Sequence, residues 1–414
     1  MFIRKQKEAK TFMFSLDNFI STYVTYRSES IFKEDIKSNY NVLSNSICNK
    51  SVLVIGGAGS IGSSFIKAIL PFHPSTLVVV DINENALAEL TRDLRSTKGM
   101  YVPKDFIPYP MDFASSIFEK MFRARNGFNI VANFSAHKHV RSEKDIYSVE
   151  ALLQNNVLHA KYLLDLLTEC PPEEYFCVST DKAANPVNVM GASKRIMEDL
   201  IFSYSDKFPV KTARFANVAF SNGSLPAGFL ARIQKLQPIS APSDVRRYFV
   251  SPEESGQICL LAAILGKNRE IFFPKLKDAQ MMTFDAIAEK LLEVEGYEVL
   301  RCDSDEEAIN KAEDLKKGSK KYPVHFELSD TSGEKPYEEF YTDKESVDFE
   351  RLNALGVITN KPIPDKKKLD ALFSHLTEAF DKNQTTKEEV VSILEQYLPN
   401  FKHIETGKSL DNKM

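Results

Sequence analysis

The sequence predicts an α/β fold, in which a doubly wound parallel sheet of the Rossmann type is accompanied by a smaller C-terminal α/β domain. Apolar runs typical of buried strands alternate with helical patterns from residue 51 to about 218, as a parallel sheet with crossover helices requires. Gly56, Gly59 and Gly62 follow the first run, and Asp81 ends the second run, nineteen residues after Gly62. Strand, glycine turn, helix, strand and acid in this order are typical of dinucleotide-binding folds, where the acid lies about 20 residues beyond the glycines.

The remaining elements follow in order along the chain. Residues 1–49 carry apolar side chains at roughly helical spacing, which predicts a helical N-terminal extension for packing or oligomer contact. Residues 50–218 form the expected dinucleotide-binding domain. Its strands are predicted at 51–55, 76–80, 106–109, 129–134, 174–179 and 210–215.

The C-terminal half has a weaker pattern. Beyond Asn217 the alternation loosens and prolines interrupt it, so we assign residues 219–382 to a substrate-binding region. Residues 383–414 predict an amphipathic helix, which includes Val390 and Leu394, and a polar, disordered end.

Composition limits the class of protein. A chain of 414 residues exceeds the usual size of one core, which favours two domains. The net charge of −4 gives no general attraction to nucleic acid or anionic membranes. No apolar run approaches the ~20 residues of a membrane span, and no signal-peptide core follows Met1, so we expect a cytoplasmic protein. The five cysteines lack paired spacing, which predicts neither disulfides nor a metal site.

The first strand and its glycine turn predict a site for a pyrophosphate. Gly56, Gly59 and Gly62 allow a tight turn and close approach of a ligand, and Ser60 and Ile61 lie in the same turn. A structural glycine turn is the alternative, but the surrounding order of elements favours dinucleotide binding.

Asp81 bears on the choice of dinucleotide. Its carboxylate suits a ribose 2′-hydroxyl and repels a 2′-phosphate, and the following Ile82-Asn83-Glu84 offers no Arg or Lys to bind one. NAD is therefore favoured over NADP. Asp81 is also suited to cap the helix expected near Asn85, alone or together with ribose binding.

A second group of polar residues follows the apolar run Tyr175-Phe176-Cys177-Val178. Ser179-Thr180-Asp181-Lys182 come first, and Met190-Gly191-Ala192-Ser193-Lys194 come a few residues later. Polar side chains just beyond a parallel strand are where α/β folds place their chemistry. An ordinary strand exit with a Thr-Asp turn is the alternative.

Further motifs accompany these two groups: Lys138-His139-Val140, Asn156-Val157, Asn185-Pro186, Arg214-Phe215-Ala216-Asn217-Val218, Arg247-Tyr248-Phe249 and Ser332-Gly333-Glu334-Lys335. Together they resemble the nucleotide-sugar 4,6-dehydratases that act on UDP-N-acetylglucosamine, in the extended short-chain dehydrogenase superfamily. The likeness covers about residues 50–355 and is closest to the soluble members. The run 179–195 is specific to this group, whereas the glycine motif is shared widely, and Ala216 stands where relatives commonly have Gly.

The resemblance implies a reaction and its catalytic residues. UDP-N-acetylglucosamine would become a UDP-4-keto-6-deoxy-hexosamine for surface polysaccharide or glycan synthesis, with NAD taking the C4 hydride and returning it to C6. The resemblance implies that Asp181 is the acid for the C6 hydroxyl and Lys182 the C5 base, which requires a lowered pKa for Lys182, with Lys194 as a plausible cationic neighbour. Lys194 would also bind the nicotinamide ribose.

Met190 departs from the superfamily pattern Tyr-xxx-Lys. A thioether cannot accept a proton, so the C4 base must come from elsewhere, with Thr180 or Asp181 nearest in sequence. The chain is then either inactive or uses a relocated base. A subset of the resembled dehydratases carries Met in this position, which favours activity.

The resemblance also implies the binding residues. Asp112 would contact adenine, and the residues expected near the UDP-sugar are Lys138, His139, Asn217, Arg247, Glu334 and Lys335. Arginine suits a diphosphate because its fork donates two hydrogen bonds. Alternatively, Lys138 and His139 belong to a solvent-facing basic loop, and Asp112 is a turn residue. Relatives assemble through helices flanking the sheet, so we expect a homo-oligomer.

Two other functions stand beside this one. A C4 epimerase or ketoreductase on the same scaffold also oxidises C4, but an epimerase has no use for an acid and a base at C6 and C5, so Thr180-Asp181-Lys182 argues against it. A catalytically silent NAD-binding protein is compatible with Met190.

Overall fold

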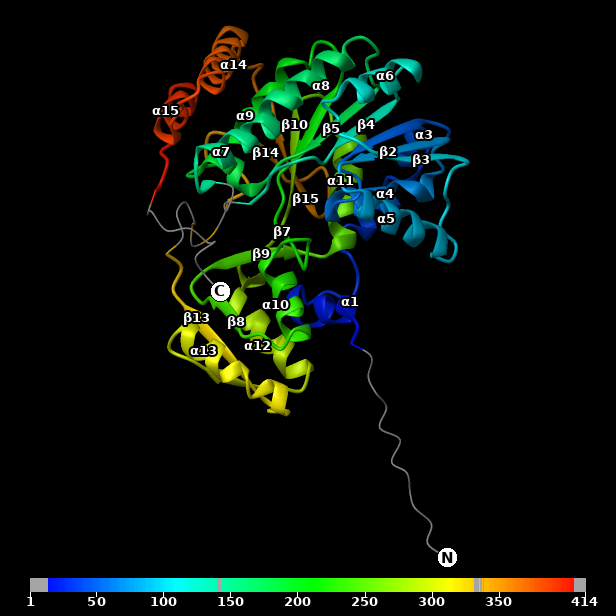
Figure 1. The fold of residues 1–414 in the computed structure, drawn as a ribbon. Coiled ribbons are helices and arrows are strands. Elements are labelled where there is room, and N and C mark those ends of the chain that lie inside the picture. Colours follow the sequence, from blue (N-terminus) through cyan, green and yellow to red (C-terminus); the bar gives the residue numbers. More distant parts are fainter. Residues whose placement is uncertain (1–13, 140–142, 331–334, 336, 338, 406–414) are drawn as a thin grey trace, which may run out of the picture.

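A nine-stranded sheet forms the larger part of the molecule (Figure 1). The computed structural model describes residues 14–139, 143–330, 335, 337 and 339–405. The strands run in the order β14-β15-β10-β6-β5-β4-β1-β2-β3. Their bounds are β1 (Ser51–Ile55), β2 (Thr76–Asp81), β3 (Asp105–Pro110), β4 (Ile130–Asn133), β5 (Glu174–Val178), β6 (Val210–Ala213), β10 (Glu270–Pro274), β14 (Ser346–Asp348) and β15 (Leu355–Thr359).

The predicted Rossmann-type α/β fold is confirmed. The strands from β3 to β10 are parallel, whereas β14 and β15 add an antiparallel edge. Predicted strands coincide with β1 to β6, apart from one or two residues at their ends. Helices cover both faces of the sheet (Figure 1). They are α3 (Tyr40–Ile47), α4 (Ser60–Ile69), α5 (Glu84–Ser96), α6 (Ser116–Ala124), α7 (Ile146–Leu153), α8 (His159–Leu167), α9 (Val189–Ser203) and α11 (Pro252–Leu265).

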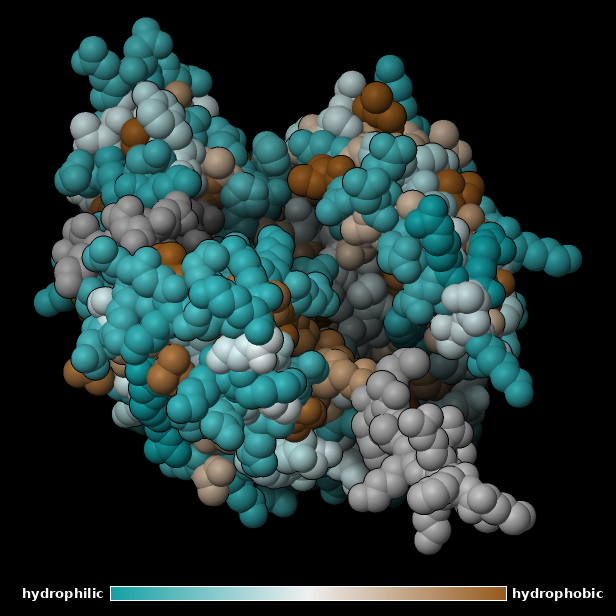
Figure 2. All heavy atoms as spheres, turned by 60° about the horizontal axis from the view of Figure 1, so that its bottom comes forward, coloured by the Kyte–Doolittle hydropathy of each residue, from teal (hydrophilic) through white to brown (hydrophobic). Residues whose placement is uncertain are grey.

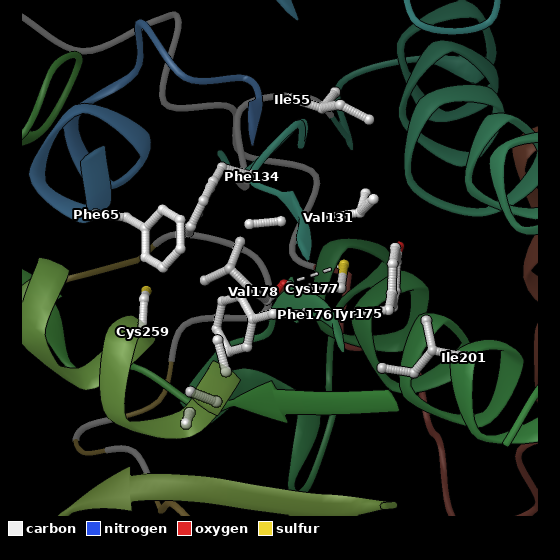
Figure 3. Close-up of a cluster of buried hydrophobic side chains, with 14 of the residues drawn as sticks. Ile55, Phe65, Val131, Phe134, Tyr175, Phe176, Cys177, Val178, Ile201 and Cys259 are labelled. Carbon is white, nitrogen blue, oxygen red and sulfur yellow. Dashed lines mark hydrogen bonds between the residues drawn. The ribbon is translucent and has the colours of Figure 1, made fainter. Parts of the chain in front are cut away.

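Strand β5 lies in the middle of this sheet and is buried on both faces. Figure 3 shows Phe176 near Phe134, on the side of α11, while Tyr175 and Cys177 lie toward Ile201 of α9. The ring centroids of Phe134 and Phe176 are 5.9 Å apart. Side chains of successive strand residues point to opposite faces, so a run that is apolar throughout is suited to this central position. The run fixes the place where the following polar residues leave the sheet.

The smaller part has its own core around two three-stranded sheets, β11-β9-β7 and β12-β13-β8. Its surface is mainly hydrophilic (Figure 2). The strands are β7 (Asn217–Val218), β8 (Ile239–Pro242), β9 (Arg246–Val250), β11 (Met281–Thr283), β12 (Glu298–Arg301) and β13 (Lys321–Glu327), and the helices are α10 (Leu225–Gln234), α12 (Phe284–Val294) and α13 (Asp305–Ala312). The chain leaves the large sheet after β6, returns for β10, leaves again, and returns for β14 and β15.

The N-terminal segment packs against both parts. Phe19, in α1 (Leu16–Phe19), belongs to the smaller core and meets Phe220 edge to face at 5.7 Å. Asp35, in α2 (Lys33–Ser38), is buried and accepts hydrogen bonds from the backbone N–H groups of Asn353 (2.7 Å) and Ala354 (2.9 Å), directly before β15. The beginning of the described chain is thus bound to the turn that leads into one of its last strands.

Two C-terminal helices, α14 (Lys366–Phe380) and α15 (Lys387–Tyr397), pack together beside α8 and α9 (Figure 1). Val390 and Leu394 of α15 are fully buried, and the Tyr397 hydroxyl donates to Asp199 of α9 at 3.4 Å. Residues 406–414, in the polar end that the sequence predicts to be disordered, lie outside the described residues. Among the residues that the structure does describe, no helix combines the length and apolar character that crossing a bilayer demands.

Candidate active site

The turn between β1 and α4 brings backbone atoms closer together than side chains would allow. Gly56 has a φ of +69°, and a Cβ on it would lie 2.6 Å from the backbone nitrogen of Ser135. A Cβ on Gly62 would lie 2.4 Å from the carbonyl oxygen of Gly56. Glycine is therefore required at both positions.

This turn leaves the N-terminus of α4 suited to an anion. The N-cap, Gly59, has no side chain to accept a hydrogen bond, and the first backbone N–H groups of a helix have no partner within it. In α4 these groups belong to Ser60, Ile61 and Gly62. The Ser60 hydroxyl accepts from the backbone N–H of Asn222 (2.9 Å), which joins the turn to the smaller part. Together with the helix dipole, such an N-terminus favours a phosphate group.

Asp81 lies at the end of β2, beside the same turn. Its two carboxylate oxygens accept from the backbone N–H groups of Ala58 (3.0 Å) and Asn83 (2.9 Å). Because each carboxylate oxygen accepts more than one hydrogen bond, the fixed group still has capacity for ribose hydroxyls. The side chain that caps α5 is that of Asn83, which accepts from Ala86 at 3.0 Å. The capping role considered for Asp81 therefore belongs to Asn83.

A cavity of about 310 Å³ lies at the carboxyl ends of β1, β2 and β4. Its lining includes Gly56, Asp81 and Asp112 among the predicted cofactor residues, with the apolar Ile82 and Phe113 nearby. Asp112 is exposed, and one of its carboxylate oxygens accepts from the backbone N–H of Ala114 (2.9 Å), so it is also a turn residue. Apolar walls with two carboxylates at the rim suit a nucleoside.

The polar residues after β5 form a tight group around one atom. The Thr180 hydroxyl (2.8 Å), the backbone N–H of Lys182 (2.9 Å) and the Lys182 ammonium (3.2 Å) all donate to Oδ1 of Asp181. The Asp181 side chain is 5% exposed and that of Lys182 is 18% exposed. An acid and an amine are thus held side by side at the carboxyl end of a central strand, where proton transfers can be directed to a bound molecule.

Met190 and Lys194 lie one layer behind this group, on α9, and both are buried. The Lys194 ammonium donates to the carbonyl oxygen of Val178 (3.1 Å) and lies 3.6 Å from the Met197 sulfur. Burial lowers the pKa of Lys194, because desolvation disfavours the charged form. Lys194 is therefore bound to the last residue of β5, directly before Ser179.

Asn156, which is not among the predicted site residues, connects the loop after β4 to α9. Its side chain accepts from the His137 backbone N–H (2.9 Å) and donates to the His137 carbonyl oxygen (2.9 Å) and the Ser193 hydroxyl (3.1 Å). It lies in a π-helical turn, Gln154–Leu158, a rare irregularity that is common at functional sites. The motif Asn156-Val157 was the available signal.

Lys138 and His139 follow on this loop and are exposed. The His139 ring lies against Gly223 of the smaller part, where a Cβ would approach its Nε2 to 2.9 Å. Although Lys138 is exposed, the protein atoms around it desolvate its amine and lower its pKa. The loop therefore reaches across from the large sheet to the smaller part.

The predicted residues for the UDP group come from the smaller part and the loop beyond it. Arg247 is 4% exposed, and its guanidinium donates to the carbonyl oxygens of Arg246 and Lys335, both at 2.9 Å. The Lys335 ammonium donates to the Asn185 carbonyl oxygen (2.6 Å), in the loop that follows Lys182. Asn217 is half-buried on β7, paired with β9. Glu334 lies outside the described residues.

A buried network of ion pairs around Arg214 contacts the polar segment after β5 through Ser179. The Arg214 guanidinium, fully buried, bonds both oxygens of Glu198 (2.9 and 2.8 Å) and both oxygens of Glu345 (2.8 and 2.9 Å). The Ser179 hydroxyl also donates to Glu198 (2.7 Å). Hydrogen bonds and charge from Arg214 and Lys361 outweigh the cost of burial and lower the pKa of Glu345 to about 2. The sequence gives no sign of Glu198 or Glu345, because buried pairs distant along the chain follow no spacing rule.

Sequence comparisons connect this geometry to known proteins. A family model described as polysaccharide biosynthesis protein matches residues 52–359. An uncharacterized membrane protein of Methanocaldococcus jannaschii is 30% identical over 362 residues, which cover 86% of this chain and 98% of that protein. The capsular polysaccharide biosynthesis protein CapD of Staphylococcus aureus is 27% identical over 75% of this chain, which spans only 51% of that longer relative. The UDP-N-acetylglucosamine 4,6-dehydratase (inverting) of Campylobacter jejuni is 27% identical over 55% of this chain and 67% of its own length.

Solved structures share the fold. Pen from Bacillus thuringiensis has a TM-score of 0.61 at 21% identity, over 80% of this chain and 98% of its own. A UDP-N-acetylglucosamine 4-epimerase from Methanobrevibacter ruminantium, in complex with UDP-N-acetylmuramic acid, has a TM-score of 0.53 at 16% identity. The match covers 80% of this chain and 98% of that protein. WbmF of Bordetella bronchiseptica, in complex with NAD⁺ and UDP, has a TM-score of 0.50 at 17% identity. The match covers 61% of this chain and 80% of that protein. At these identities the likeness is one of fold.

Proposed function

The chain belongs to the polysaccharide biosynthesis protein family, and from this premise we propose that it is an NAD-dependent dehydratase that converts UDP-N-acetylglucosamine to a UDP-4-keto-6-deoxy-hexosamine. The observation that carries the proposal is the convergence of Thr180 and Lys182 on one oxygen of Asp181. A dehydratase needs an acid and a base on one side of its substrate. Relatives whose names state a UDP-N-acetylglucosamine 4,6-dehydratase support the choice of reaction.

The residues of the first βα unit fit NAD. The N-terminus of α4, with Gly59 at its cap, would hold the pyrophosphate, and Asp81 would accept from the adenosine ribose. Asp112 would lie near the adenine and Lys194 near the nicotinamide ribose. When bound, NAD would accept a hydride from C4 of the sugar and return it to C6.

We assign the proton transfers to the group after β5. Because the Thr180 hydroxyl donates to Asp181, the pair is suited to take the C4 proton that Met190 cannot accept. Lys182, in its neutral amine form, would remove the C5 proton and return a proton to C5 when the hydride reaches C6. Asp181, having gained a proton, would then deliver it to the departing C6 hydroxyl.

The other predicted residues would bind and orient the sugar nucleotide. Arg247 and Lys335, already joined by a hydrogen bond, would lie along the diphosphate, with Asn217 beside them and Glu334 in the same segment. Lys138 and His139 would approach the sugar from the loop after β4. We place the UDP group between the smaller part and the loop that follows Lys182, because Arg247, Lys335 and Asn185 meet there.

Mass spectrometry tests this proposal directly. The full chain is incubated with UDP-N-acetylglucosamine and NAD⁺, with NADP⁺ in a parallel reaction. We expect a product lighter by one water with NAD⁺. An unchanged mass with a new stereoisomer on chromatography would indicate an epimerase. Recovery of unaltered substrate would indicate a silent binding protein, and a preference for NADP⁺ would overturn the role of Asp81.

A further inference from the structure

We propose that Glu143 is a positioning residue of the active site and that a C-terminal segment, residues 387–405, holds Glu143 in place. The kinetic part of this inference rests on the proposed function, whereas the structural part stands on the contacts alone. Glu143 lies four residues beyond His139 in sequence. Its side chain is 7% exposed.

The Glu143 carboxylate closes the N-terminus of α9. Its two oxygens accept from the backbone N–H groups of Val189 (3.0 Å) and Met190 (2.9 Å), and the side chain of the N-cap, Asn188, accepts from Gly191 (2.7 Å). The first N–H groups of α9 therefore have acceptors, in contrast to those of α4. An anion at this end is also favoured by the helix dipole.

The C-terminal segment meets Glu143 from outside. The His403 ring nitrogen Nε2 lies 3.2 Å from the Glu143 carboxylate, and the Lys387 ammonium donates to the Glu143 carbonyl oxygen (2.7 Å). The backbone N–H of Ile404 donates to the carbonyl oxygen of Val187 (3.0 Å), just before α9. Lys387 and Glu405 form an ion pair within the segment. The segment thus contacts both the carboxylate and the loop that it orients.

The first turn of α9 contacts the catalytic group directly. A Cβ on Gly191 would lie 2.8 Å from the carbonyl oxygen of Lys182, so the two backbones are in van der Waals contact. Met190 and Lys194 belong to the same helix. A shift of this turn would therefore move the Lys182 backbone and the position of Lys194 relative to β5. Through Glu143 the C-terminal segment contributes to the geometry of proton transfer, although it carries no proposed catalytic residue.

Hydrogen exchange in the full chain tests the structural part. In Glu143→Gln the amide can accept only one of the two N–H groups, and in His403→Ala the carboxylate loses its outer partner. We expect the amides of Val189 and Met190 to exchange about tenfold faster in Glu143→Gln, since loss of one hydrogen bond changes an equilibrium by roughly that factor. We expect faster exchange of the same amides in His403→Ala. In His403→Gln, which keeps a hydrogen-bond donor near the Glu143 carboxylate, exchange should stay slow.

Kinetics test the positioning role in the same variants. We expect kcat to fall by about tenfold or more in Glu143→Gln, since misplacement by about 1 Å can cost about 100-fold. The KM for UDP-N-acetylglucosamine and the Kd for NAD should stay within about twofold, because their proposed contacts lie on other elements. Glu388→Gln, an exposed carboxylate on α15, and Lys402→Ala, beside His403, are the matched controls and should behave as the unaltered protein.

Two results would overturn the inference. The first is unchanged amide exchange and kcat in both Glu143→Gln and Glu143→Ala. The second is a loss of NAD binding together with kcat, which would mean that Glu143 supports the fold as a whole. If the unaltered protein does not dehydrate UDP-N-acetylglucosamine, the proposed function fails, and the exchange experiment alone decides the role of Glu143.

Discussion

Three hydrogen-bond donors converge on one carboxylate oxygen of Asp181. In the proposed reaction Asp181 would first act as a carboxylate, so it would have to gain a proton before it could serve as an acid. The C4 hydroxyl would be the source of this proton, because the Thr180 hydroxyl donates to Asp181 and could pass a proton on to it. One carboxylate would then serve both the first and the last proton transfer.

We expect Asp181→Asn and Lys182→Met to stop the reaction at different steps. With one carboxylate in both transfers, Asp181→Asn should form no NADH, because the C4 proton has no acceptor. Lys182→Met should oxidise C4, accumulate bound NADH and fail to exchange the C5 proton. Each dehydration rate should fall by about 100- to 10,000-fold. Single-turnover absorbance at the NADH band and deuterium incorporation at C5 measure the two steps.

Two outcomes would contradict this assignment. NADH accumulation in Asp181→Asn would place the C4 base elsewhere, and near-normal dehydration by both variants would remove the group from the mechanism. Thr180→Val, which keeps the shape but lacks the hydroxyl, should resemble Asp181→Asn if the pair acts together.

Some residues of the site are readable from the sequence and others are not. Gly56, Gly62 and Asp81 are readable because a backbone conformation or a specific charge demands one residue type at a fixed spacing. Glu143 and Glu198 are not, since their partners are backbone N–H groups and an arginine whose positions only the folded chain determines. Carboxylates of this kind look like any surface acid until the fold is known.

At the level of elements, the buried network around Arg214 joins three segments. Glu198 belongs to α9, Arg214 follows β6, and Glu345 lies in the segment that follows Lys335. The Arg214 guanidinium also donates to the Phe340 carbonyl oxygen (2.9 Å). Because Ser179 shares Glu198 with Arg214, the network connects the exit of β5 to the segment proposed to bind UDP.

This network should make stability depend on pH under acidic conditions. The pKa of Glu345 is lowered from an ordinary value of 4.5 to about 2 in the folded protein. A carboxyl group whose pKa is lowered by folding adds stability at pH above its unfolded value, and this stability is lost as pH falls toward the folded value. We therefore expect the free energy of unfolding to decline between about pH 4.5 and 2, and to decline less in Glu345→Gln.

Urea unfolding followed by circular dichroism over this pH range measures the effect. Glu339→Gln, an exposed carboxylate in the same segment, is a control that should keep the slope of the unaltered protein. Parallel slopes in Glu345→Gln and the unaltered protein would exclude Glu345 as a source of the acid dependence.

The sequence predicts some elements much better than others. Strands β1, β2, β4 and β5 are apolar except at their ends because helices cover both faces of the sheet, and such runs are distinctive. The antiparallel pair β10 and β15 has no local signal, since its strands are about 80 residues apart and pair only in the folded chain. The short strands of the smaller part, interrupted by prolines, are likewise set by packing rather than by pattern.

At the scale of the whole molecule, Asp35 joins the N-terminal helix α2 to the turn before β15. We expect Asp35→Ala to lower the free energy of unfolding by about 1–3 kcal/mol, because it removes the acceptor of two backbone N–H groups, one of them buried. Urea unfolding measures the loss. Asp17→Ala, an exposed acid in α1, should change stability by no more than about 0.5 kcal/mol. Equal effects of the two substitutions would show that the contact with residues 353 and 354 adds no stability.

The contact of Asp35 also has a consequence during synthesis. Its partners lie 318 and 319 residues further along the chain, so at about 5–20 residues per second a ribosome needs roughly 15–60 s to produce them. During that interval Asp35 lacks its native partners, and once β10 has been made its edge stays open until β15 follows; an open strand edge is a target for chaperones and proteases. A nascent chain arrested before Ala354 would carry the glycine turn and the residues around Asp181. Its large sheet would still lack the edge strand β15. Ligand-binding capacity should therefore appear only after β15 has left the ribosome.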